Sequence, residues 1–267
     1  MEFKRQHSIK AILFVILPII CLLEIAAPAQ RPDVPDLPLS KGSYWVYKGT
    51  IKTRETQVNC DSTKPVERVL TLKMEVVETI DRGRIIAAVL KGNLYDLMDL
   101  EVLKSGTTEM MRTDYLFIRA GKGKYYLLDG DEIAEALKRL WDPTDLLDGL
   151  VKEDDLVFDF PLSRGKVFGN PELISRQKKE IESGDLESIG WLNVVTDERQ
   201  IKLKGVKGIN PSETVTQYQL RYGTNSSLRE TEVIPGTGIT KFDFSYHPAG
   251  CLMLETNVKL IEYHKGN

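Results

Sequence analysis

The chain has 267 residues, of which 42% are hydrophobic and 28% are charged, and its 36 basic and 39 acidic side chains give a net charge of −3 at pH 7. This length is enough for one domain with a sizeable core. The charge argues against a nucleic-acid partner, because such a protein needs an excess of basic side chains to displace counterions from phosphate.

Residues 1–29 have the pattern of an export signal. Basic side chains precede the apolar run 11–23, which is shorter than the ~20 residues that a membrane-spanning helix needs. Small residues at 27–29 fit cleavage before Gln30. We therefore expect a cleaved signal peptide, no transmembrane span in the mature chain, and an exported protein that is periplasmic or extracellular. An uncleaved anchor and a lipid-modified Cys21 are the weaker alternatives.

Residues 30–41 carry a proline at every third position from Pro32 to Pro38. Such a segment favours an extended, polyproline-like path. We expect it to be a tether between the cleavage site and a single antiparallel β domain over residues 42–267.

Two cysteines, Cys60 and Cys251, remain after the leader is removed. An oxidising compartment permits a disulfide between them, which would connect an early loop to the last hairpin. Two isolated thiols are the alternative, because the sequence does not establish that the two Cα atoms are close enough.

The mature chain is dominated by strand patterns. At 238–246 apolar residues occupy alternate positions, and after a turn the alternation resumes at 252–260, which predicts a hairpin. We expect about ten or eleven strands in one curled sheet or open barrel. The other candidate ranges are 44–47, 70–76, 85–90, 116–118, 125–128, 156–162, 191–195, 201–206, 215–222 and 228–234.

One segment changes to helical spacing. Apolar residues between Asp131 and Trp141 fall on one helix face, Asp131 is placed to cap the first turn, and Pro143 ends the helix. A second short helix is expected around 146–150, and 171–185 is a solvated helix or loop. We expect the short helices to pack on the sheet.

Catalytic and metal patterns are weak. Only His247 and His264 follow the leader, so the spacing predicts neither a metal site nor a cofactor. Asp243, Ser245 and His247 alternate along one strand, and their ~6–7 Å separation is too long for a direct catalytic triad. The sequence therefore favours a non-enzymatic domain, and a hydrolase that uses Asp243 and His247 in a cleft remains an alternative.

Aromatic side chains are the remaining candidates for a binding surface, because they can line a concave sheet and hold an apolar ligand. The alternative is that they fill the interior. The candidates are Trp45, Tyr47, Tyr126, Trp141, Phe242 and Phe244.

Three short segments, 42–47, 160–165 and 235–239, resemble a diffuse group of uncharacterised exported bacterial β-rich proteins. The layout is also distantly similar to the periplasmic lipoprotein-carrier open barrels. That resemblance implies an antiparallel sheet curled around an apolar cavity plugged by a helix, and it carries over no functional residue.

The function expected from these patterns is binding of an apolar small molecule, a lipid or an envelope protein by an exported domain. The alternatives are the hydrolase and a structural or interaction protein of the cell envelope, which would present an exposed apolar patch.

Overall fold

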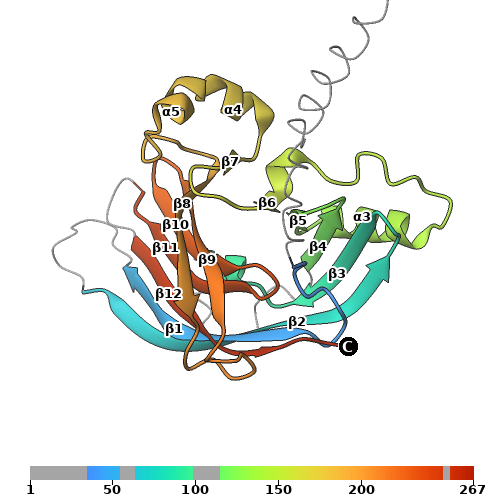
Figure 1. The fold of residues 1–267 in the computed structure, drawn as a ribbon, viewed down its shortest axis with the longest axis horizontal. Helices are drawn as coiled ribbons and strands as arrows, with labels where there is room; N and C mark the ends of the chain where they lie inside the picture. The colour runs from blue at the N-terminus through green and yellow to red at the C-terminus, as the bar shows by residue number, and fades with distance from the viewer. Residues whose placement is uncertain (1–34, 55–63, 99–114, 249–252) are drawn as a thin grey trace, which may run out of the picture. The chain divides into compact units, whose positions relative to one another are not determined.

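The computed structural model describes residues 35–54, 64–98, 115–248 and 253–267. Their strands form one twelve-stranded antiparallel sheet that curls into a nearly closed barrel (Figure 1). The predicted fold class is therefore confirmed.

The strands, labelled as in Figure 1, are β1 (Tyr44–Arg54), β2 (Val66–Asp81), β3 (Ile85–Lys91), β4 (Tyr115–Ala120), β5 (Lys124–Leu128), β6 (Leu156–Asp159), β7 (Val167–Phe168), β8 (Asn193–Lys202), β9 (Thr214–Gly223), β10 (Ser227–Ile234), β11 (Gly238–Tyr246) and β12 (Met253–His264). The helices are α3 (Glu132–Trp141), α4 (Pro171–Arg176) and α5 (Lys178–Ser183), with 3-10 turns η2 (Leu94–Met98) and η4 (Glu153–Asp155).

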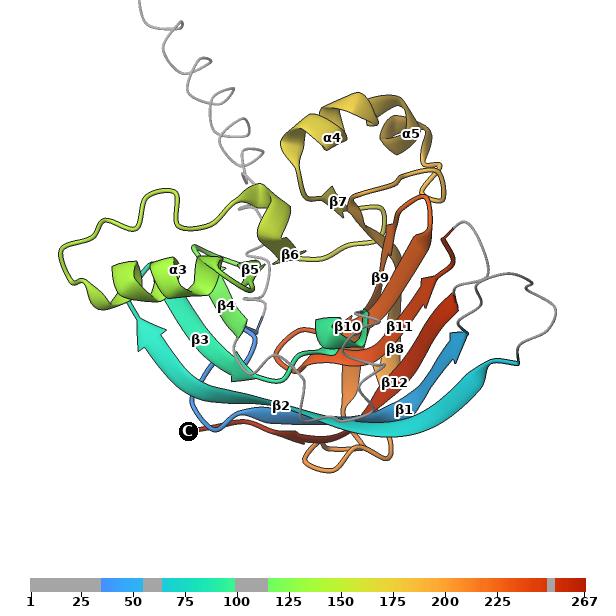
Figure 2. The ribbon, with the colours of Figure 1, turned by 180° about the vertical axis from the view of Figure 1, so that it is seen from behind.

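The strand order is β6-β5-β4-β3-β2-β1-β12-β11-β10-β9-β8-β7. Consecutive strands are thus paired with each other throughout, except for β6 and β7. The first and last strands, β1 and β12, are also paired with each other. The two edges, β6 and β7, are consecutive in the chain. Figure 2 shows the sheet curling from one edge round to the other.

The central pair joins the two halves of the sheet. β1 pairs with β12 from Tyr44↔His264 to Arg54↔Met253, with one register shift after Val46. The backbones approach closely at Gly49, where an added Cβ would lie 1.9 Å from the carbonyl oxygen of Asn257. A side chain at this position would push the two strands apart.

The predicted C-terminal hairpin is confirmed by the pairing of β11 with β12. Phe242 and Phe244 alternate with exposed or half-buried polar residues and are buried, as are Leu254 and Val258 on the neighbouring strand. One face of the sheet therefore lines the core, as the period-two pattern requires.

The other face is covered in two places. On β4 and β5 the residues facing away from the interior are buried as well, and we infer that α3 covers them with Ile133, Ala136 and Leu140. α4 and α5 pack on a satellite cluster of Ile189, Leu192 and Val194 near the start of β8.

Three predicted elements differ from the structure. Parts of the ranges 191–195 and 201–206 belong to one strand, β8 (Asn193–Lys202), because backbone pairing with β9 continues through residues whose side chains are exposed, and residues 203–206 lie beyond it. Residues 146–150 form turns rather than a helix, with Leu147 at a φ of 61° and its amide bound to Asp145. The helix expected from Asp131 begins there, but the Asp131 side chain makes no capping hydrogen bond.

The proline-rich segment also differs from the expected tether. Within its described part, Leu37, Pro38 and Leu39 are buried, and both leucines belong to the main core cluster. Prolines keep the segment extended, so that two leucines on either side of Pro38 can enter the core.

No helix among the described residues combines the length and the apolar character required to cross a membrane.

Substitution of Gly49 tests the central pairing. Gly49→Ala should lower the free energy of unfolding by about 1–3 kcal/mol or more, because its Cβ overlaps the β12 backbone. Urea denaturation measures this loss. Gly190→Ala is the control, since its Cβ would meet only the carbonyl oxygen of Gly223 at 3.7 Å. Equal stability of the two variants would contradict the close approach of β1 and β12.

The disulfide stays a prediction, because Cys60 and Cys251 lie outside the described residues. The nearest described residues of the two strands, Arg54 and Met253, are paired and lie six and two residues from the two cysteines. Intact-mass analysis of the oxidised mature protein should find no free thiol before reduction and two after it. Two thiols that alkylate without reduction would count against the bridge.

Candidate ligand-binding site

The site is built around η2, which enters the interior of the curled sheet directly after β3. Gly92, at a φ of 74°, turns the chain where an added Cβ would lie 2.5 Å from the carbonyl oxygen of Lys73. Leu94 and Leu97 of η2 are fully buried. The segment is held to the opposite wall by the Thr256 hydroxyl, which donates to the carbonyl of Leu97 at 3.1 Å. η2 thus spans the interior from β3 to β12.

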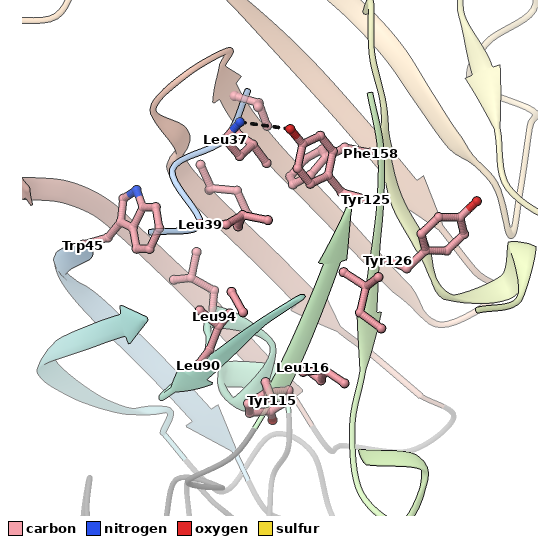
Figure 3. Close-up of a cluster of buried hydrophobic side chains, with 14 of the residues drawn as sticks. Leu37, Leu39, Trp45, Leu90, Leu94, Tyr115, Leu116, Tyr125, Tyr126 and Phe158 are labelled. Carbon is pink, nitrogen blue, oxygen red and sulfur yellow. Dashed lines mark hydrogen bonds between the residues drawn. The ribbon is translucent and has the colours of Figure 1, made fainter. Parts of the chain in front are cut away.

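The N-terminal segment forms a second internal feature (Figure 3). The Tyr125 hydroxyl accepts a hydrogen bond from the Leu37 amide at 3.0 Å and donates one to the Asp36 carboxylate at 3.0 Å. Arg119 forms an ion pair with the same carboxylate. The Thr79 hydroxyl donates to the carbonyl of Leu39. These bonds fix the segment against β2, β4 and β5.

Burial raises the pKa of the Tyr125 hydroxyl, and it also raises the pKa of Tyr47, whose hydroxyl donates to the carbonyl of Ile239 at 2.9 Å. Both hydroxyls are therefore neutral donors at physiological pH. The indole nitrogen of Trp45 donates to the carbonyl of Thr237 at 2.6 Å. Trp45 and Tyr47 of β1 thus donate hydrogen bonds to backbone carbonyls in the β10–β11 turn and at the start of β11.

An apolar cavity lies between the N-terminal segment, η2 and the strands β4 to β6. Its free volume is about 50 Å³, which is well below the ~300–1,000 Å³ of typical ligand pockets. Leu37 and Leu39 form part of its wall. The residues lining it are Leu37, Leu39, Trp45, Met74, Leu90, Asn93, Leu94, Tyr95, Phe117, Leu127, Val157, Phe158, Gly238 and Ile239.

The wall is incomplete at the seam between β6 and β7, the two edges of the sheet. Here no ladder of backbone hydrogen bonds joins the described strands, and side chains make the connection. The Asn193 amide donates to the carbonyl of Leu156 at 3.2 Å, and Lys166 lies 3.1 Å from the Asp159 carboxylate. Side-chain contacts and the chain segment between β6 and β7 thus take the place of a ladder at this seam.

A second hollow, of about 230 Å³, lies on the outer face of β1, β12, β11 and β10. Its lining is mainly polar and includes Asp243, Ser245 and Glu255. The Asp243 carboxylate accepts hydrogen bonds from Lys241 and Asn257, while His247 lies 3.6 Å from Glu255. The groups of the hydrolase alternative thus bind separate partners, and this geometry gives that alternative no support.

The six aromatic candidates are divided among different surroundings. Trp45 lines the apolar cavity, and Phe244 borders the outer hollow. Tyr47 and Phe242 are fully buried. Tyr126 is buried too, but it points to the opposite side of β5 from Tyr125 (Figure 3). Trp141, at the end of α3, is 59% exposed.

Sequence reasoning missed Tyr95, Phe117, Phe158 and the two N-terminal leucines. Leu94, Leu97 and Met98 have helical spacing, and this signal could have identified η2. The described residues contain no group of three or more His, Cys, Asp or Glu that could hold a metal ion.

Removal of one hydroxyl tests the attachment of the N-terminal segment. Tyr125→Phe should lower the free energy of unfolding at pH 7 by about 1–3 kcal/mol, because the buried Leu37 amide loses its acceptor. Chemical denaturation measures the loss. Tyr246→Phe is the control, since no hydrogen bond joins its hydroxyl to the described residues. An equal loss in both variants would contradict the attachment.

The same variant has a predicted pH dependence. Burial raises the folded-state pKa of Tyr125 above the ~10 of the unfolded chain, so the unfolded chain ionises first and stability falls as the pH rises past that value. Tyr125→Phe should therefore show a smaller loss of stability between pH 9 and 11 than the wild type, as measured by denaturation across about this range.

No protein-family model matches the chain, and no curated protein matches it. Among solved structures, the chain is similar to a protein of Bacteroides fragilis NCTC 9343 that is described as exported and as having a YmcC-like fold. The TM-score is 0.35 at 9% sequence identity, and the match covers 87% of this chain and 100% of that one.

Proposed function

We propose that this protein is an exported, non-enzymatic β domain that binds an apolar, lipid-like ligand inside its curled sheet. The observation that carries the proposal is the apolar cavity between η2 and β4 to β6, because part of its wall comes from the N-terminal segment rather than from the sheet.

The cavity is small, so the proposed binding requires side chains that border it to move. Leu37 and Leu39 occupy space beside the cavity that an alkyl chain would fill, and a few side-chain hydrogen bonds hold their segment. The seam between β6 and β7 supplies an entry route. A ligand would displace the leucines and exchange one apolar contact for another, at the cost of those hydrogen bonds.

The N-terminal leader, with its cleavage pattern before Gln30, supports export. An exported domain that sequesters an acyl chain from water would have a use in the envelope, where lipids must cross an aqueous space.

The uncharged fluorophore N-phenyl-1-naphthylamine tests the cavity. Delipidated mature protein should bind it saturably, with a rise in fluorescence. Leu37→Ala should bind it about tenfold more tightly, because removal of three carbons enlarges the cavity for the probe. The same change should lower the free energy of unfolding by about 2–5 kcal/mol.

Leu192→Ala is the matched control. Leu192 is as deeply buried but belongs to the satellite cluster, so its truncation should destabilise the protein without tightening the binding of the probe. If the wild type does not bind the probe, or if both variants bind it equally, the interior is not the ligand site.

A further inference from the structure

Arg229 is an arginine that faces the interior of the sheet. It pairs across the strands with Phe244 on one side and Tyr222 on the other, and its guanidinium lies over the ring of Tyr95 on η2. Its side chain is only partly buried. The cation therefore lies on the inner face of the sheet without being fully buried.

Among the described residues, the contacts of this guanidinium are with neutral groups. Its central carbon lies 4.9 Å from the ring centres of both Tyr95 and Tyr222, and Nη2 donates to the Asn193 side-chain oxygen at 2.8 Å. No carboxylate of the described residues forms an ion pair with Arg229. By contrast, Arg119, Arg139 and Arg199 each have a carboxylate partner.

This arrangement leaves part of the guanidinium available to an oxyanion. Two tyrosine rings contact the guanidinium, and one donor is used by Asn193, so several of its five N–H groups remain. A guanidinium offers these donors as a planar fork that matches a carboxylate or a phosphate. A cation partly removed from water is stabilised when an anion binds to it.

The apolar cavity and this guanidinium share one neighbour, although Arg229 itself does not line the cavity. Tyr95 lines the cavity and also contacts Arg229. Asn193, which holds the guanidinium, donates to Leu156 at the start of β6, and the next two β6 residues line the cavity. A cation and an apolar cavity that share one tyrosine would suit the two ends of a monoacyl amphiphile.

We propose that Arg229 binds the oxyanion head group of a single-chain amphiphile whose alkyl tail occupies the apolar cavity. This inference rests on the proposed function and names the ligand class: a carboxylate or phosphate joined to an acyl or alkyl chain. Tyr95 and Tyr222 hold the guanidinium in position, and Asn193 orients it toward the seam where the ligand enters.

Displacement of N-phenyl-1-naphthylamine by four twelve-carbon ligands tests the proposal. At pH 8 the wild type should bind dodecanoate or dodecyl phosphate about 10–100-fold more tightly than dodecanol, since a hydrogen bond to a charged group contributes more than a neutral one. Dodecyltrimethylammonium should bind no better than dodecanol. The preference between the two anions identifies the head group as carboxylate or phosphate.

Arg229→Met should reduce the ratio between anion and alcohol to about one while dodecanol still binds. Arg229→Lys keeps the positive charge but loses the planar guanidinium, and it should give a ratio between those of the wild type and Arg229→Met. This second variant keeps the test possible if Arg229→Met does not fold. Arg164→Met removes an exposed arginine and should leave the ratio unchanged.

The outcomes separate the two proposals. If neither the fluorophore nor any twelve-carbon ligand binds the wild type, the proposed function fails and this inference fails with it. If dodecanol binds as tightly as dodecanoate, or if the anion preference survives in Arg229→Met, the interior still binds apolar chains but Arg229 is not the head-group site.

Discussion

The pairing of β1 with β12 is the contact on which the rest of the structure depends. It is the point at which the two six-stranded halves of the sheet meet, and it joins residues separated by almost the whole length of the mature chain. The glycine at position 49 lets the two backbones approach. Because this closure is made at the middle of the sheet, the free edges fall at β6 and β7, and no backbone ladder joins these two described strands.

Within this topology, the interior is packed with residues from inside and outside the sheet. The core is filled by residues of the sheet, by η2 and by two leucines of the N-terminal segment. η2 is fixed at both ends, whereas the N-terminal segment is held through Tyr125, Thr79 and Arg119. In the proposed function, the part of the core that a ligand would replace is therefore the part that borders the apolar cavity. The further proposal places the polar end of that ligand at Arg229.

The sequence predicted the elements whose apolar residues follow a regular period. The alternation at Phe242, Phe244, Leu254 and Val258 predicted the hairpin and its buried face, and the helical spacing before Pro143 predicted α3. It did not predict the candidate site, because the cavity is formed by residues that are far apart in the chain and have no common period. Asn193, Tyr222 and Arg229 belong to three strands and meet only through the register. Leu37 lies in a segment whose prolines indicated a tether, and tertiary packing overrode that local preference.

A filtered NOE experiment with carbon-13-labelled dodecanoate on the delipidated mature protein tests the central claim most directly. The account predicts contacts between the protons of the alkyl chain and the rings of Tyr95, Phe117 and Phe158, which line the interior cavity. Contacts confined to the outer hollow around Leu228, or none to the three rings at saturating ligand, would contradict binding inside the sheet.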